Sequence, residues 1–192
     1  MRVEPRAHSD YPWFIRIFFW KQKRRYGSVL NSGQIWARSP WVFSALALLY
    51  GALDRKSSPI DPALRSLVTV RVSQINHCAF CVDINSATLL KRGVPPEKVE
   101  ALQGWRDSNL FDERERSALS YAEAVTRSDE DVDDSLFGQL RKHFDDDGLV
   151  ELTGLIAFQN MSSKFNSALD IPAQGFCSLP DTAGVRSERS ES

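Results

Sequence analysis

Two cysteines three positions apart are the residues of this chain whose spacing best suggests chemistry. Cys78 and Cys81 lie in the stretch SQINHCAFCVDINSA, residues 73–87, which contains neither Gly nor Pro. On a helix their Cβ atoms would be about 5 to 6 Å apart, and a disulfide needs roughly 3.5 to 4.5 Å, so a modest adjustment closes the pair. At a helix start, free N–H groups and the helix dipole also stabilise a thiolate. The spacing favours reversible thiol chemistry and leaves open whether peroxide or a disulfide is the partner.

A zinc site and a purely structural pair are the alternatives to redox chemistry. Structural zinc takes four ligands, and beyond the two cysteines the chain offers only the scattered His8, His77 and His143, so we expect no metal. A structural pair stays open, because free cysteines are often buried as small hydrophobic side chains. His77 directly precedes Cys78, and it is either a neighbour of the thiolate or an exposed turn residue.

Composition limits the class of protein. The chain has 192 residues, 42% of them hydrophobic, which is enough for one sizeable core. Lys and Arg total 24 against 25 for Asp and Glu, so we expect no nucleic-acid partner and no anionic membrane surface. No apolar run approaches about 18 residues, and the first ten residues, MRVEPRAHSD, lack the apolar stretch of a secretory signal. With few cysteines for a disulfide framework, these features predict a cytoplasmic protein.

Helical patterns that would position the cysteines run along nearly the whole chain. Apolar residues recur at spacings of three and four, Ser39-Pro40 and Asp61-Pro62 are typical helix starts, and Gly93 is typical of a left-handed helix end. The acidic segment DERER, residues 112–116, matches the positive end of a helix dipole. The patterns predict helices over residues 12–24, 40–53, 62–76, 79–92, 94–103, 112–125, 133–144 and 148–166.

We therefore predict an all-α bundle of about seven to eight helices. Residues 1–179 would form a single domain with an N-terminal helical extension, and the polar residues 180–192, without aromatics, would form a disordered tail. Residues 11–20, together with Trp36 and Trp41, carry more aromatic surface than a monomer of this length usually exposes. We therefore expect at least a dimer.

Three stretches carry a resemblance to a known family: LRSLVTVRVSQINHCAFCVDINSATLLKRGV, DERERSALSYAEAVTR and LVELTGLIAFQNMSSKFNSAL. They resemble the core of the carboxymuconolactone decarboxylase and alkylhydroperoxidase D-like proteins, over about Tyr26 to Phe176. The resemblance implies an antioxidant-defence-like helical bundle, usually homo-oligomeric, whose peroxidase members reduce hydroperoxides with the CxxC pair. It implies a thiol or dithiol reductant and no cofactor. It also implies that Cys81 is the peroxidatic cysteine that becomes a sulfenic acid, and that Cys78 resolves it as a disulfide and meets the electron donor.

The chain departs from the peroxidase motif of that family at two positions. The motif is CxxCxxxH with a Glu twelve residues before the first cysteine, and here Asn85 stands at the His position and Ser66 at the Glu position. Asn85 can donate a hydrogen bond to a thiolate, but neither residue accepts a proton near neutral pH. Activation of Cys81 would then come from the helix N-terminus or from His77. Glu151, on a largely apolar helix, is either paired with an arginine or a buried carboxylate whose raised pKa would let it substitute as a base.

Two functions remain after these departures, and lactone decarboxylation is disfavoured because it also needs a proton donor and acceptor. The first function is a thiol-dependent peroxidase of the peroxiredoxin type that reduces hydroperoxides. The second is a non-catalytic or redox-sensing helical oligomer with little turnover, which the missing Glu and His support. Cys177 is either a distant resolving cysteine or a buried hydrophobic side chain.

Overall fold

The computed structural model describes residues 1–177, and the tail predicted at 180–192 lies outside the described residues. Within residues 1–177 the chain forms nine α-helices and two short 3-10 helices, without a strand, which confirms the all-α class. The elements are η1 (His8–Asp10), α1 (Trp13–Tyr26), α2 (Asn31–Trp36), α3 (Pro40–Leu53), α4 (Pro62–Ile75), α5 (Ala79–Lys91), α6 (Pro96–Ala101), η2 (Leu102–Asp107), α7 (Glu113–Thr126), α8 (Asp134–Leu140) and α9 (Asp146–Ala168).

The nine α-helices agree with the predicted bundle of about seven to eight helices except for one short addition, and several predicted boundaries move. Helix α2 was not predicted, because its six residues, NSGQIW, are too few to show an apolar period. Helix α8 ends at Leu140, four residues before the predicted end, because a short turn follows it. Helix α9 begins at Asp146, since Asp145 caps it by accepting a hydrogen bond from the N–H of Gly148 at 2.8 Å.

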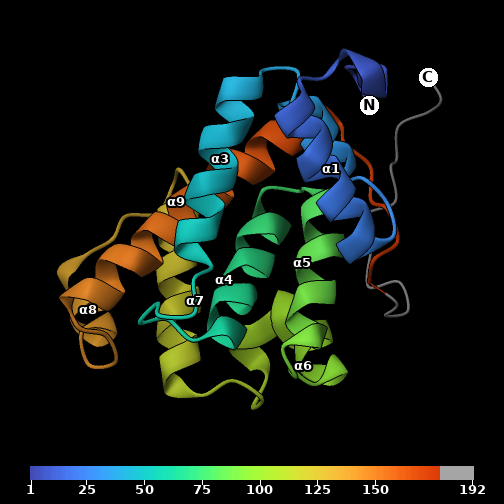
Figure 1. Cartoon of the computed structure of the whole chain (residues 1–192). Helices are drawn as coiled ribbons and strands as arrows, with labels where there is room; N and C mark the ends of the chain where they lie inside the picture. Colours follow the sequence, from blue (N-terminus) through green and yellow to red (C-terminus); the bar gives the residue numbers. More distant parts are fainter. Residues whose placement is uncertain (178–192) are drawn as a thin grey trace, which may run out of the picture.

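Helix α4 is the centre of the bundle and is buried along most of its length. It begins at the predicted Asp61-Pro62, where the Asp61 carboxylate accepts a hydrogen bond from the N–H of Leu64 at 2.9 Å. It lies beside α5 and packs on α7 and α9 (Figure 1). Its buried apolar side chains, which include Leu67, Val68 and Val72, belong to the largest hydrophobic core cluster. The residues that lead into the cysteine pair therefore belong to a helix that is held in place by packing against α5, α7 and α9.

A tight turn joins α4 to α5 and fixes where the cysteines lie. After Asn76, His77 takes a left-handed conformation with φ of 51°, and the N–H of Cys78 donates to the carbonyl of Ser73 at 3.1 Å. Helix α5 then starts at Ala79 and ends before Gly93, whose φ of 84° confirms the predicted left-handed end. The turn lies at the end of the bundle that α1 and α3 cover (Figure 1).

Helices α1 and α3 form a second, aromatic-rich cluster and leave other apolar side chains exposed. Tyr11, Phe19 and Phe43 are buried in this cluster. On the outer face, Trp13 is 72% and Trp41 81% exposed. We call this outer face the α1/α3 apolar surface; its exposed members are Trp13, Ile17, Trp20, Trp41, Val42 and Leu48. No helix in residues 1–177 combines the length and the apolar character needed to cross a bilayer.

Candidate active site

Cys78 and Cys81 form a disulfide at the start of α5, with 5.2 Å between their Cα atoms. Cys78 is the N-cap residue of this helix, and its Sγ accepts a hydrogen bond from the N–H of Cys81 at 3.2 Å. Both residues are buried, with 1% and 2% of their surface exposed. The helix start therefore holds the two sulfur atoms within bonding reach, and the structure represents the oxidised form of the predicted redox pair.

A cavity of about 490 Å³ reaches Cys81 and not Cys78. Its volume is within the range of pockets that hold small organic ligands. The walls come from α1, α2, α3, α5 and α9, and seven aromatic side chains line it: Phe18, Tyr26, Trp36, Phe43, Tyr50, Phe80 and Phe158. A substrate in this cavity would meet the sulfur of Cys81 first.

Asn166 on α9 supplies a hydrogen-bond donor to Cys81. Its Nδ2 lies 3.2 Å from Sγ of Cys81, and its Oδ1 accepts a hydrogen bond from the hydroxyl of Ser32 at 2.8 Å. Asn166 is 1% exposed, so its side chain has little freedom to turn away. An amide N–H stabilises a thiolate more than a neutral thiol, because hydrogen bonds to charged groups are the stronger ones. Asn166 is therefore a candidate activating residue that the sequence did not identify.

Replacing Asn166 with leucine is expected to slow the oxidation of reduced Cys81 by hydroperoxide by about tenfold or more. A lost hydrogen bond to a charged group is worth about 1.5–3 kcal/mol, which corresponds to roughly 10- to 150-fold. Stopped-flow measurement of sulfenic acid and disulfide formation checks this expectation. Ser162→Ala is the matched control, because Ser162 also lines the cavity from α9 but makes no hydrogen bond to the sulfur. Equal rates for Asn166→Leu and the parent protein would remove Asn166 from the mechanism.

Asn85 lines the cavity together with Cys81, but its amide is directed to another partner. Its Nδ2 donates to the hydroxyl of Ser73 at 3.2 Å, and Gln159 donates to the same oxygen at 2.9 Å. The hydroxyl of Ser73 in turn donates to the carbonyl of Thr69 at 2.6 Å. Asn85 thus stabilises the packing of α5 on α4 and α9, and in this form of the protein it does not donate to Cys81.

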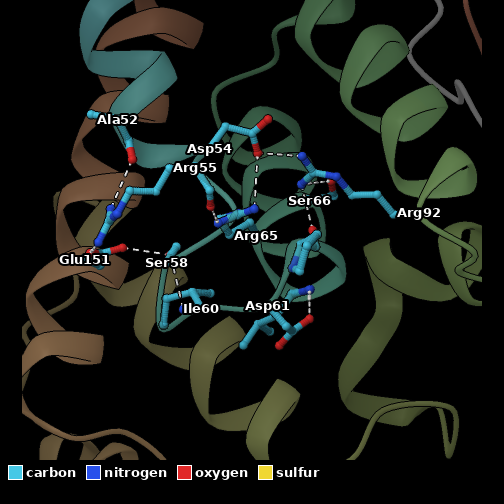
Figure 2. A network of polar contacts seen from close by, with 12 residues as sticks. Ala52, Asp54, Arg55, Ser58, Ile60, Asp61, Arg65, Ser66, Arg92 and Glu151 are labelled. Carbon is cyan, nitrogen blue, oxygen red and sulfur yellow. Dashed lines mark hydrogen bonds and ion pairs between the residues drawn. The ribbon is translucent and has the colours of Figure 1, made fainter.

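Ser66, at the position where the family's peroxidase motif has Glu, belongs to an ion-pair network (Figure 2). Its hydroxyl accepts a hydrogen bond from Arg92 at 2.9 Å, and Arg92 also contacts the carboxylate of Asp54 at 2.5 Å. Arg65 lies 3.5 Å from the same carboxylate. Asp54 follows α3 and lines the cavity that contains Cys81. The cavity therefore has a carboxylate, and two guanidinium groups hold it in ion pairs.

Two other candidates for activating the thiol lie away from it. His77 is exposed on the turn before Cys78. Glu151 forms an ion pair with Arg55 and accepts a hydrogen bond from Ser58 at 2.7 Å, as Figure 2 shows. The hydrogen bond from Arg55 is the main reason that the pKa of Glu151 is lowered below its ordinary value, against a smaller opposing effect of burial. Of the two alternatives for Glu151, the pairing with an arginine is therefore confirmed, and the base with a raised pKa is wrong.

The segment after α9 covers the start of α5. The carboxylate of Asp83 accepts hydrogen bonds from the N–H of Gln174 at 2.8 Å and of Cys177 at 2.7 Å. Ile171 of the same segment packs in a buried cluster with both paired cysteines. Cys177 is a half-buried free cysteine.

Within residues 1–177, no group of three or more His, Cys, Asp or Glu side chains is arranged to hold a metal ion.

Comparison with known proteins places the chain in a family. The model of the carboxymuconolactone decarboxylase family matches residues 40–124, which include the cysteine pair. The uncharacterized protein YnjA of Escherichia coli K12 is 46% identical over 173 residues, which cover 90% of this chain and 95% of that protein.

Two solved structures share the fold. One is the alkylhydroperoxidase AhpD core of an uncharacterized peroxidase-related protein from Ralstonia eutropha JMP134, with a TM-score of 0.83, 23% identity and coverage of 91% of this chain and 93% of that chain. The other is the debrominase Bmp8, with a TM-score of 0.78, 23% identity and coverage of 90% and 91%. These likenesses confirm the antioxidant-defence-like bundle. With the family match and the relative in Escherichia coli, they establish that the chain belongs to the carboxymuconolactone decarboxylase family.

Proposed function

We propose that this protein is a thiol-dependent peroxidase that reduces hydroperoxides with Cys81 and Cys78. The observation that carries the proposal is that the two cysteines form a disulfide while Cys81 also lines an aromatic cavity. We also propose a cytoplasmic location, because a pair that cycles through the dithiol form needs a reducing compartment.

The proposed cycle has three steps. The thiolate of Cys81 attacks the hydroperoxide, the O–O bond breaks, Sγ gains one oxygen as a sulfenic acid, and the product leaves as an alcohol after taking a proton. The thiol of Cys78 then attacks Sγ of Cys81, so that the S–S bond forms and water leaves. A thiol or dithiol reductant returns both cysteines to thiols and is itself oxidised to a disulfide.

Activation of Cys81 in this proposal comes from fixed dipoles and not from a proton relay. The N-terminus of α5 and the amide of Asn166 both favour the thiolate. Asn85 and Ser66 cannot supply the proton that the leaving alkoxide needs, so that proton comes from solvent. Because a positioned acid or base contributes about 10²- to 10⁴-fold, we expect slower turnover than with the complete motif.

The experiment that tests the function is stopped-flow oxidation of the reduced protein by hydrogen peroxide and by cumene hydroperoxide. We expect disulfide formation to be faster than the oxidation of a free thiol, and faster with the organic peroxide because the cavity is apolar. Rates equal to those of a free thiol would end the peroxidase proposal. If such slow oxidation also changed the elution volume of the protein, the redox-sensing oligomer would be the better description.

We propose further that two or more copies of the chain associate through the α1/α3 apolar surface. Burial of exposed aromatic side chains would provide the driving force, and three of the aromatic residues that the prediction counted, Trp13, Trp20 and Trp41, are exposed on this face. Light scattering at micromolar concentration should give at least twice the 21.7 kDa of one chain. Trp41→Glu should lower that mass, and a monomer in the parent protein would contradict the proposal.

A further inference from the structure

Two cations of α1 line the cavity that contains Cys81 and have no acidic partner among residues 1–177. Lys21 and Arg25 are four residues apart, so they project from the same side of the helix. Neither forms an ion pair with a carboxylate in residues 1–177. Both are exposed, whereas Cys81 is 2% exposed. The cations therefore lie at the solvent side of the cavity and the sulfur at its inner end.

The remaining charges of the cavity do not cancel these two cations. Asp54 is the one carboxylate among the described lining residues, and Arg92 and Arg65 already neutralise it. Tyr50 also lines the cavity, and its partial burial and the nearby Asp54 carboxylate raise its pKa to about 12, so it stays neutral near pH 7. The cavity thus has a net positive charge although the chain as a whole carries a net charge of −1.

Apolar side chains make up much of the lining of the cavity that holds the cations and the sulfur. Phe18 and Phe43 pack edge to face with 4.9 Å between ring centroids, and Leu46, Phe80 and Ile84 continue the lining. A cavity lined largely by apolar side chains, with cations at its solvent side and a nucleophile at its inner end, matches an amphipathic anion whose reactive group lies away from its charge.

We propose that the substrate is a hydroperoxide of a long-chain carboxylic acid. The carboxylate contacts Lys21 and Arg25, the hydrocarbon chain lies against the aromatic walls, and the hydroperoxide group reaches Sγ of Cys81. The assignment of a hydroperoxide group to this ligand rests on the proposed peroxidase function. The recognition of its carboxylate by the two cations does not depend on that function.

The kinetic test compares linoleic acid hydroperoxide with its methyl ester, both below the concentrations at which they form micelles. The parent protein should show a kcat/KM for the acid about tenfold above that for the ester, since two partly exposed ion pairs support a factor of this size. The double variant Lys21→Ser/Arg25→Ser should lose this preference. The matched control is Lys23→Ser/Arg24→Ser, which removes the same charge from α1 outside the cavity and should keep the preference.

A binding measurement separates the failure of this inference from the failure of the peroxidase function. Linoleic acid, which has no hydroperoxide group, should bind the disulfide form more tightly than methyl linoleate in calorimetry, and the Lys21/Arg25 double variant should lose the difference. If no hydroperoxide is turned over but this pattern is found, the peroxidase proposal is wrong and the carboxylate site stands. If linoleic acid and methyl linoleate bind equally, or if the difference between them is unchanged in the double variant, the carboxylate site is wrong.

Discussion

Cys81→Ser is expected to lower peroxidase turnover by at least about 10³-fold, the scale of loss when a nucleophile is removed from an enzyme. A serine hydroxyl does not take up the peroxide oxygen, so no sulfenic acid forms and the first step is absent. Steady-state consumption of cumene hydroperoxide with a dithiol reductant measures the loss. Cys177→Ser is the matched control, because this half-buried free cysteine is not among the lining residues of the cavity and its replacement should change turnover less than about twofold.

Cys78→Ser should give a different result from Cys81→Ser. The first step should survive for one turnover, because Cys81 still lines the cavity, and the sulfenic acid should accumulate because no neighbouring thiol resolves it. Trapping with dimedone and mass spectrometry would then find the adduct on Cys81. An adduct on Cys78 in the Cys81→Ser variant, formed at the parent rate, would show that the two roles are exchanged.

The helices and the cysteine pair were predictable because their signals are local. The Asp61-Pro62 start, the period of apolar residues along α4 and the Gly93 end all act within a few residues of the structure that they determine. The reach of Cys78 to Cys81 follows from helix geometry in the same way. Local rules also place His77 in the turn, where its left-handed φ fits a residue between two closely packed helices.

The partners of Cys81 could not be predicted because they come from distant parts of the chain. Asn166 follows Cys81 by 85 residues and reaches it only after α9 packs on α5. A signal was nevertheless present: Gln159, Ser163 and Asn166 continue the buried face of α9 with polar side chains at spacings of four and three. A polar residue on a buried apolar face is either left without a hydrogen bond or has a polar partner from another part of the chain, and the second is much more common. The sequence around Asp54 gave no comparable signal, because its place in the cavity wall and its ion pairs with Arg92 and Arg65 arise only when distant segments pack together.

Replacing Glu123 with alanine is expected to lower the free energy of unfolding by about 3–5 kcal/mol, which is the usual cost of leaving a buried partner charge uncompensated. The Glu123 carboxylate is buried and accepts hydrogen bonds from Arg71 at 2.6 Å, Trp105 at 2.9 Å and Arg106 at 2.6 Å. These contacts tie α7 to α4 and η2. Urea denaturation followed by circular dichroism measures the loss.

The two arginine partners of Glu123 provide the matched comparison. Arg71 is 11% exposed and Arg106 57% exposed at the side chain. Arg71→Ala should therefore cost several times more stability than Arg106→Ala, because solvent already screens the exposed pair. Equal losses for the two variants would show that burial does not determine the strength of this cluster.

The same carboxylate should make stability depend on pH in the acidic range. Burial alone would raise the pKa of Glu123, but the hydrogen bond from Trp105 and the charge of Arg71 outweigh it and hold the pKa below the ordinary value of 4.5. A group with a lowered pKa in the folded state stabilises the fold fully above its unfolded pKa, and this contribution falls as pH drops through the folded pKa. The difference in unfolding free energy between the parent protein and Glu123→Gln should therefore be largest near neutral pH and shrink as pH falls below 4.5. The pKa of Glu151 is also lowered, so Glu151→Gln should give a similar dependence of the unfolding free energy on pH. This dependence should be smaller, because its partner Arg55 is partly exposed. A difference for Glu123→Gln that stays constant down to about pH 3 would mean that the pKa of Glu123 is the same in the folded and unfolded states, and the ion-pair account of the α4–α7 contact would then be wrong.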